Sequence, residues 1–151
     1  AVAGSNFTQE DMYTKPDQAI SFIKQTNVDC LAVSFGSSHG TMPVGYEPHF
    51  DFNIVKRIKK VTGKPLVLHG GSGSGNENIR KSIEAGINKI NVGSDVMDAQ
   101  SVAIFNQLVE DKHSDFVNVM SSSIIAAKKV VEEYIELSGS VDKAALQTIT
   151  Q

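Results

Sequence analysis

The sequence lacks several features that mark particular classes of protein. Cys30 is the only cysteine among its 151 residues, which excludes an internal disulfide framework and fits a reducing compartment, so we expect a cytoplasmic protein. No apolar run approaches the ~20 residues that a membrane span needs. The formal net charge is -3, which gives no basic excess to attract nucleic acid or an anionic membrane. We therefore expect neither kind of partner.

The first residues, AVAGSNFTQEDM, have neither the charged region nor the apolar stretch of a signal peptide, and they do not begin with methionine. We expect no signal peptide and interpret residues 1–4 as the tail of a strand. A length of 151 residues with 40% hydrophobic content suits one soluble segment with a sizeable core.

Three apolar segments predict β-strands, at 30–35 (CLAVSF), 65–69 (PLVLH) and 87–92 (INKINV). The first two are apolar almost throughout, as in parallel strands covered on both faces. Helical patterns lie between and after them, over residues 15–26, 51–63, 76–86, 95–111 and 116–139.

End signals support the first three of these helices. Pro16 suits the first turn of a helix, Asp51 an N-cap, and Gly63 and Gly86 the stops of the second and third helices. We expect Cys30, at the start of its strand, to pack in the core. The helix residues that we expect to be buried are Ala19, Phe22, Ile23, Ile54, Val55, Ile58, Val61, Ile79 and Ile83.

Alternating strands and helices are typical of right-handed βα units on a parallel sheet. The pattern fits either a doubly wound sheet or a piece of a (βα)₈ barrel. A complete TIM barrel takes ~250 residues. If the fold is a barrel, residues 1–151 are therefore about half of one, with the last three to four βα units.

The three predicted strands end in polar or glycine-rich stretches, where parallel α/β folds bind ligands. His39 follows the first strand and His69 closes the second, and each is followed by glycine. Either histidine alone is more typical of a hydrogen-bonded packing residue, but as a pair they could share a divalent cation such as zinc. A third ligand is missing, because His49 and His113 lie in segments expected at the surface.

The segment GGSGSGNEN, residues 70–78, is typical either of a plain βα loop or of a phosphate site. In a phosphate site, glycine N–H groups, the hydroxyls of Ser72 and Ser74 and the next helix's N-terminus would surround the anion. It matches neither a Walker A loop nor a dinucleotide fingerprint. Asn91, Gly93 and Ser94 in NVGSD would form a second wall, although such residues are also ordinary helix caps.

LAVSFGSSHG, KPLVLHGGSG and INKINVGSD, in this order and spacing, resemble the class II, metal-dependent ketose-bisphosphate aldolases, which include the fructose- and tagatose-bisphosphate enzymes. The flanking helices resemble that family too. The resemblance covers the C-terminal half of the family's TIM barrel, from the end of the fifth strand to the eighth.

The resemblance implies a role for each matching residue. His39 and His69 would be two of three histidines that hold the metal, Glu10 would match the loop glutamate that takes the substrate's proton, and Asn91 would reach the hydroxyketone end. The residues implied to contact dihydroxyacetone phosphate are Gly40, Gly70, Gly71, Ser72, Asn91, Val92, Gly93 and Ser94.

The resemblance also implies that the enzyme binds Zn²⁺ or another divalent cation, and that a monovalent cation can bind as a second ion. It implies a cytoplasmic lyase that acts in carbohydrate metabolism, for example in glycolysis. The reaction would be reversible aldol cleavage of a ketose bisphosphate to dihydroxyacetone phosphate and an aldehyde. Family members carry the first metal-binding histidine and an Asp earlier in the barrel. We therefore expect this segment to need its N-terminal half for activity, or to form a homo-oligomer.

The sequence departs from the family at three positions. Gly93 stands where fructose enzymes often have Asp or Asn, Ser94 replaces a Thr, and Pro43 replaces a Lys. Two other interpretations stay open: a non-catalytic phosphosugar-binding half-barrel, and a degenerate interaction fragment with exposed sheet edges.

Overall fold

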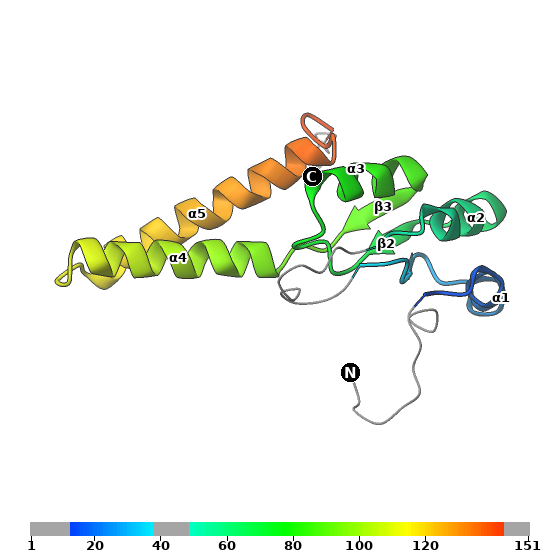
Figure 1. Ribbon diagram of the computed structural model, residues 1–151, viewed down its shortest axis with the longest axis horizontal. Helices are drawn as coiled ribbons and strands as arrows, with labels where there is room; N and C mark the ends of the chain where they lie inside the picture. The colour runs from blue at the N-terminus through cyan, green and yellow to red at the C-terminus, as the bar shows by residue number, and fades with distance from the viewer. Residues whose placement is uncertain (1–12, 38–48, 144–151) are drawn as a thin grey trace, which may run out of the picture. The chain divides into compact units, whose positions relative to one another are not determined.

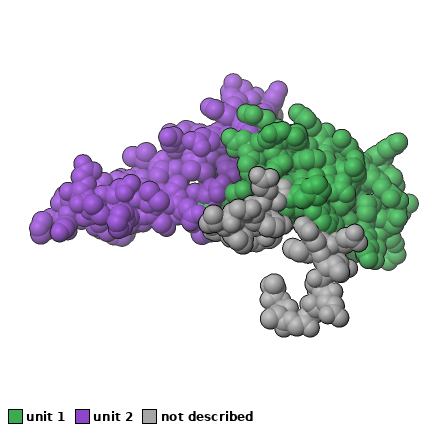
Figure 2. Space-filling view, in the orientation of Figure 1, with its two compact units in different colours: residues 1–94 green, residues 95–151 purple. Residues whose placement is uncertain are grey.

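The computed structural model describes residues 13–37 and 49–143. The sequence predictions for Glu10, His39, Gly40 and Pro43, and for a strand tail at 1–4, fall outside these ranges. The chain divides into two compact units, residues 1–94 and residues 95–151 (Figure 2). That both units belong to one barrel segment stays a prediction.

The first unit contains a three-stranded parallel sheet in the order β1-β2-β3 (Figure 1). The strands are β1 (Leu31–Ala32), β2 (Leu66–Leu68) and β3 (Ile87–Ile90). The parallel βα arrangement predicted from the sequence is therefore confirmed, although each strand is shorter than its apolar segment. Backbone bonds from Val33 N to the Val67 carbonyl (3.4 Å) and from Asn91 N to the Leu68 carbonyl (3.0 Å) continue both ladders toward the carboxyl ends.

Three helices pack on one face of this sheet: α1 (Pro16–Thr26), α2 (Phe52–Thr62) and α3 (Asn76–Ala85). Their ends follow the sequence signals. The Asp51 carboxylate accepts a bond from Asn53 N (3.0 Å), and Gly63 ends α2 with φ 65°, a left-handed conformation that glycine adopts without strain. Neighbouring helices contact each other, α1 with α2 and α2 with α3.

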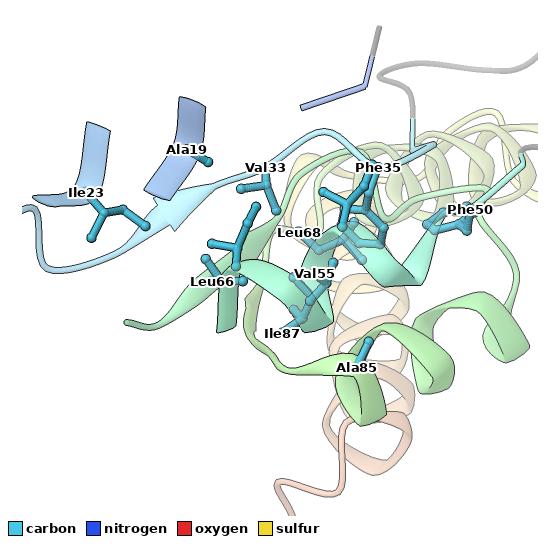
Figure 3. Close-up of a cluster of buried hydrophobic side chains, with 12 residues drawn as sticks. Ala19, Ile23, Val33, Phe35, Phe50, Val55, Leu66, Leu68, Ala85 and Ile87 are labelled. Carbon is cyan, nitrogen blue, oxygen red and sulfur yellow. The ribbon is translucent and has the colours of Figure 1, made fainter. Parts of the chain in front are cut away.

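The core lies between the helices and the sheet (Figure 3). Leu66 and Leu68 of β2 are fully buried in it, and Val33 and Phe35 extend the same side of the sheet beyond β1. The remaining members of the cluster come mainly from helices, and they are Ala19, Ile23, Phe50, Ile54, Val55, Ile58, Ala85 and Ile87.

Three predictions of burial are wrong. Phe22 is 48% exposed and Val61 is 52% exposed, because α1 and α2 bury a narrower stripe than their apolar residues suggested. Cys30 is exposed as well. Side chains alternate between the two faces of a strand, and Cys30 has the parity of Ala32 and Ser34, which lie on the face away from the helices.

A β-bulge interrupts the pairing of β2 with β3. Leu66 pairs with Ile87, but Val67 pairs with Lys89, so Asn88 is an extra residue. The Asn88 Oδ1 atom accepts bonds from Leu66 N (3.2 Å) and from Lys59 Nζ (2.8 Å). The Asn88 side chain thus supplies the acceptor for a buried strand N–H at the bulge.

We expect Asn88→Ala to destabilise the first unit by about 1–3 kcal/mol, because the N–H of fully buried Leu66 loses this acceptor. Asn88→Asp keeps an acceptor oxygen beside the Lys59 ammonium and should cost much less. Urea unfolding of both variants checks this. Equal losses for the two variants would contradict the role given to the Asn88 oxygen.

The second unit contains most of α4 (Ser94–Glu110) and all of α5 (Phe116–Leu137). Polar contacts join the two helices: Tyr134 Oη donates to Asp95 Oδ2 (2.5 Å), and Ser122 Oγ donates to Gln107 Oε1 (2.8 Å). Both helices also carry exposed apolar side chains, including Phe105 at 67% and Ile125 at 68% exposure. Among the described helices, none is long and apolar enough to cross a membrane.

Candidate functional site

The candidate site lies where β2 and β3 end. His69 follows the last residue of β2, and Asn91 follows the last residue of β3. The Asn91 Nδ2 atom lies 3.0 Å from Nε2 of the His69 imidazole, within hydrogen-bonding distance. The structure therefore brings together two residues that lie 22 positions apart in sequence. Both lie at the carboxyl ends of the parallel strands, called the rim below, where the sequence analysis expected a ligand site.

The bulge at Asn88 determines this pairing. With Leu68 paired to Ile90, the next step of the ladder sets His69 beside Asn91. Without the extra residue, the register that starts at Leu66 and Ile87 would set Ile90 beside His69 instead, and would turn Asn91 toward the other face. The bulge is thus a structural requirement of the site, and the sequence analysis did not predict it.

Lys89 is a polar member of the site that sequence reasoning missed. Its Nζ atom donates a hydrogen bond to Asn91 Oδ1. Lys89 pairs with Val67, so it lies on the same face as His69 and Asn91, away from the helices. The signal in the sequence was a lysine inside the apolar segment INKINV, two residues before Asn91.

The backbone at His69 is held by a neighbouring segment. Ser37 Oγ donates to the His69 carbonyl oxygen at 2.6 Å, which ties the segment after β1 to the end of β2. The His69 side chain is exposed on the face opposite the core, so the imidazole can meet a ligand. This placement agrees with the predicted rim, whereas His39 lies outside the described residues.

The turn after His69 depends on glycine. Gly70 has φ 65°, where a side chain would be strained. Gly71 is buried, and a Cβ there would lie 3.2 Å from Ile90 Cγ2 of the neighbouring strand. The two glycines therefore let the turn pass close to the end of β3, next to Asn91.

The serines of this loop differ in what they can offer a ligand. Ser74 is buried, its Oγ donates to the Gly70 carbonyl (2.9 Å), and its N–H donates to the Gly71 carbonyl (3.1 Å). Ser74 thus holds the shape of the turn, and its contact with a phosphate stays a prediction. Ser72 is half-buried, and its contact with a phosphate stays a prediction.

The first turn of α3 carries its own negative charge. Gly75 caps the helix without a side-chain hydrogen bond, and Glu77 lies in the first turn. Lys81 Nζ lies 2.6 Å from Glu77 Oε1, and this hydrogen bond and the lysine's charge hold the pKa of Glu77 below its usual range. The Lys81 ammonium therefore offsets the negative charge of Glu77, which would otherwise repel an anion at this end of the helix.

The residues predicted to form the second side of the phosphate site lead from β3 into α4. Val92 and Gly93 connect β3 to α4, and Ser94 is the first residue of that helix. A Cβ built on Gly93 meets nothing within 4 Å, so the described structure has room there for the larger residues that the resemblance led us to expect. The contacts of Val92, Gly93 and Ser94 with substrate stay predictions.

Of the two histidines predicted to bind a metal, only His69 lies in the described part of the chain. His69 places an imidazole at the rim, which suits zinc or a similar divalent ion. Within residues 13–37 and 49–143, no three His, Cys, Asp or Glu side chains lie together as a possible metal site. His49 and His113 are exposed, as predicted, and do not complete one. Metal binding by His69 and His39 therefore stays a prediction.

The comparison with family models decides the family. Residues 2–143 match the model of the class II fructose-bisphosphate aldolases. This chain belongs to the class II fructose-bisphosphate aldolase family. The resemblance expected from the three strand-end motifs is therefore confirmed, and it extends over nearly the whole sequence.

Known members of the aldolase family are about twice as long. Protein YdjI of Escherichia coli (strain K12) is 38% identical over 132 residues, which cover 87% of this chain and 45% of YdjI. The crystal structure of the YdjI aldolase aligns with a TM-score of 0.74 at 36% identity and covers 87% of this chain and 47% of that one. The chain thus spans about half the length of this relative.

A more distant structure shows the fold alone. The fructose-bisphosphate aldolase of Campylobacter jejuni is 20% identical to this chain, with a TM-score of 0.73 over 91% of this chain and 49% of that one. The parallel sheet and its helices therefore match part of an aldolase fold, which agrees with the predicted partial (βα)₈ barrel.

Proposed function

We propose that this chain forms the C-terminal half of a class II aldolase site, which cleaves a ketose bisphosphate reversibly to dihydroxyacetone phosphate and an aldehyde. The observation that carries the proposal is the 3.0 Å contact between Asn91 Nδ2 and His69 Nε2 at the ends of adjacent parallel strands. The Gly70–Gly71 turn passes beside this pair. Membership of the class II aldolase family supports aldol cleavage as the reaction at this site.

His69 and His39 would hold a Zn²⁺ or another divalent cation, together with a ligand from outside this chain. When bound, such an ion supplies a Lewis acid for the substrate's ketone oxygen. The imidazole of His69 is suited to this because it is exposed at the rim while its backbone is fixed by Ser37. A monovalent cation is a second ion that the same rim could take.

The chain's own residues bind and orient the substrate. The Asn91 amide would donate to the oxygen at the hydroxyketone end, and Glu10 would accept the substrate's proton as a general base. Phosphate held away from the reacting carbons positions those carbons for cleavage. The residues that would hold it are Gly40, Gly70, Gly71, Ser72, Val92, Gly93 and Ser94.

Lys89 adds a positive charge to this rim, and it favours a substrate that carries two phosphates. Its ammonium lies beside Asn91 on the same face as His69. A cationic group beside Asn91 would attract a bisphosphate and stabilise an enediolate oxygen.

The chain would act with an N-terminal half or as a homo-oligomer. Alignment with 45% of YdjI leaves the rest of that relative unmatched. Exposed apolar side chains on α5, such as Phe116 at 77% and Ile124 at 61% exposure, provide surface for such association. We place the assembly in the cytoplasm, in carbohydrate metabolism such as glycolysis.

A non-catalytic phosphosugar-binding half-barrel is the second candidate. The Gly70–Gly71 turn beside the end of β3 favours it, because backbone N–H groups in such a turn can bind a phosphate without a metal. The two candidates differ in their dependence on metal. Binding of dihydroxyacetone phosphate that survives a chelator supports the half-barrel, and loss of binding supports the aldolase.

The test of aldolase function joins the unmatched N-terminal part of YdjI to this chain in one polypeptide, called the chimera below. We expect the chimera to bind stoichiometric zinc and to release dihydroxyacetone phosphate from fructose or tagatose bisphosphate. A chelator should abolish release, and added zinc should restore it. A chimera that folds and binds zinc but cleaves neither sugar would contradict the proposal.

A further inference from the structure

We propose that Lys59 of α2 is a positioning residue: it selects Asn88 as the extra residue of the β-bulge and thereby places Lys89 beside Asn91. The contacts of Lys59 lie at the amino-terminal ends of β2 and β3, at the opposite end of the strands from the rim. Its effect on turnover rests on the proposed function, whereas its effect on strand pairing does not.

The burial of two isoleucines in β3 requires an extra residue but does not decide which residue that is. Ile87 belongs to the core and Ile90 packs against it, so both lie on the helix side of the sheet. Residues three apart on a regular strand face opposite sides, so one extra residue must lie between them. With Asn88 as the extra residue, Lys89 pairs with Val67, as observed. With Lys89 as the extra residue, Asn88 would pair with Val67 instead.

The Lys59 ammonium favours Asn88 as the extra residue. Lys59 Nζ lies 2.8 Å from Asn88 Oδ1, and the same oxygen accepts a bond from Leu66 N at 3.2 Å. A hydrogen bond from a charged donor is roughly twice as strong as a neutral one, so the bond from Lys59 is the stronger of the two. Lys89 as the extra residue could accept neither bond, because an ammonium has only donors.

Lys59 is held in place independently of the bulge. Its Nζ atom also donates to the carbonyl oxygens of Lys64 (3.2 Å) and Gly63 (3.4 Å), just beyond the end of α2, where the helix dipole favours a cation. Gly86 leaves room for the side chain, because a Cβ there would lie 2.9 Å from Lys59 Cγ. The ammonium is therefore anchored to the segment that leads into β2, and from there it reaches Asn88 in β3.

The choice of the extra residue decides where Lys89 lies. Residues two apart on a strand share a face, so Lys89 lies beside Asn91 on the side away from the core when it pairs with Val67. In that place its Nζ atom donates to Asn91 Oδ1. As the extra residue, Lys89 would leave this place, and Asn91 would lose the bond. Lys59 thus sets the position of a positive charge at the rim.

NMR spectroscopy of the chain tests the pairing. We expect nuclear Overhauser effects between the backbones of Val67 and Lys89. In Lys59→Met, which keeps the apolar stem and removes the ammonium, a second set between Val67 and Asn88 should appear. Lys59→Arg keeps a charged donor and should show only the first set. Lys60→Met, the same change at the next and exposed lysine, is the matched control and should alter nothing.

Substitution of Asn88 tests the same pairing from the other partner, and it decides the matter if Lys59→Met does not fold. Asn88→Ala removes the acceptor, so residue 88 should also pair with Val67 in part of the molecules. Asn88→Asp keeps an acceptor and should retain the pairing of Val67 with Lys89 alone. A folded Lys59→Met or Asn88→Ala variant in which that pairing is unchanged overturns the proposal.

Steady-state kinetics of the chimera test the consequence for the site. Lys59→Met should lower kcat/KM for the bisphosphate about 10-fold, within the ~100-fold that a displacement of about 1 Å can cost. In a Lys89→Met background the same change should have little further effect, because Lys59 acts through Lys89. Fully additive losses contradict this route. A chimera that is inactive with both lysines in place, while the pairing shifts as expected, contradicts the aldolase function and leaves the role of Lys59 in pairing standing.

Discussion

Gly36→Ala should destabilise the first unit by about 4 kcal/mol or more, which is among the largest effects that single substitutions have. A Cβ on Gly36 would lie 2.0 Å from the His49 backbone oxygen and 2.8 Å from Phe50 Cα. Both contacts are with backbone, so no side-chain rotation can relieve them. The φ of 123° adds strain of its own.

The surrounding contacts prevent the backbone from moving away. Tyr13 Oη donates to the His49 oxygen (2.7 Å), and Asp51 N donates to the Phe35 carbonyl (2.8 Å). The ring of Phe35 packs edge-on against the ring of Phe50, with centroids 5.5 Å apart. Separating the segments at Gly36 would therefore open the core as well.

Urea unfolding followed by circular dichroism measures this effect, with Gly63→Ala as the matched control. Gly63 also has a left-handed φ, of 65°, but a Cβ there meets nothing within 4 Å. Its substitution should cost only about 1–2 kcal/mol. If Gly36→Ala proves no more costly than Gly63→Ala, the close approach of the two segments is wrong.

His69→Ala should abolish zinc binding by the chimera and lower kcat/KM more than 100-fold. Loss of a residue that only supports a metal ligand typically costs about 10–100-fold, so loss of a ligand should cost more. The fold should survive, because the His69 side chain is exposed and the bond from Ser37 goes to its backbone oxygen.

Equilibrium dialysis with zinc and steady-state kinetics check the His69 prediction. His113→Ala is the control, since His113 is exposed and lies in the connection between α4 and α5. It should leave both zinc content and kcat/KM unchanged. Full zinc content in His69→Ala would remove His69 from the metal site and with it the proposed mechanism.

The sequence predicted those parts of the fold that depend on local chemistry. Asp51 and Gly63 act as the caps of α2 because capping depends on one side chain and a few neighbouring backbone groups. The parallel sheet followed from apolar strands alternating with helices. His69 and Asn91 were placed at one rim because parallel strands end on the same side.

Features that depend on register or on neighbouring elements were not predicted. The bulge at Asn88 arises from pairing between β2 and β3, which no local pattern specifies. Lys89 gains its contact only through that register. Cys30 was expected to be buried because cysteine usually is, but the parity of the strand turns it away from the helices.

The most direct test of the shared site is an NMR titration of the chain with dihydroxyacetone phosphate, with unphosphorylated dihydroxyacetone as control. We expect the amide signals of Gly70, Gly71 and Gly93 and the side-chain amide of Asn91 to shift together, and only with the phosphorylated ligand. If dihydroxyacetone phosphate shifts signals of the Gly70–Gly71 turn without those of Asn91, or shifts neither, then the turn and Asn91 do not form one site.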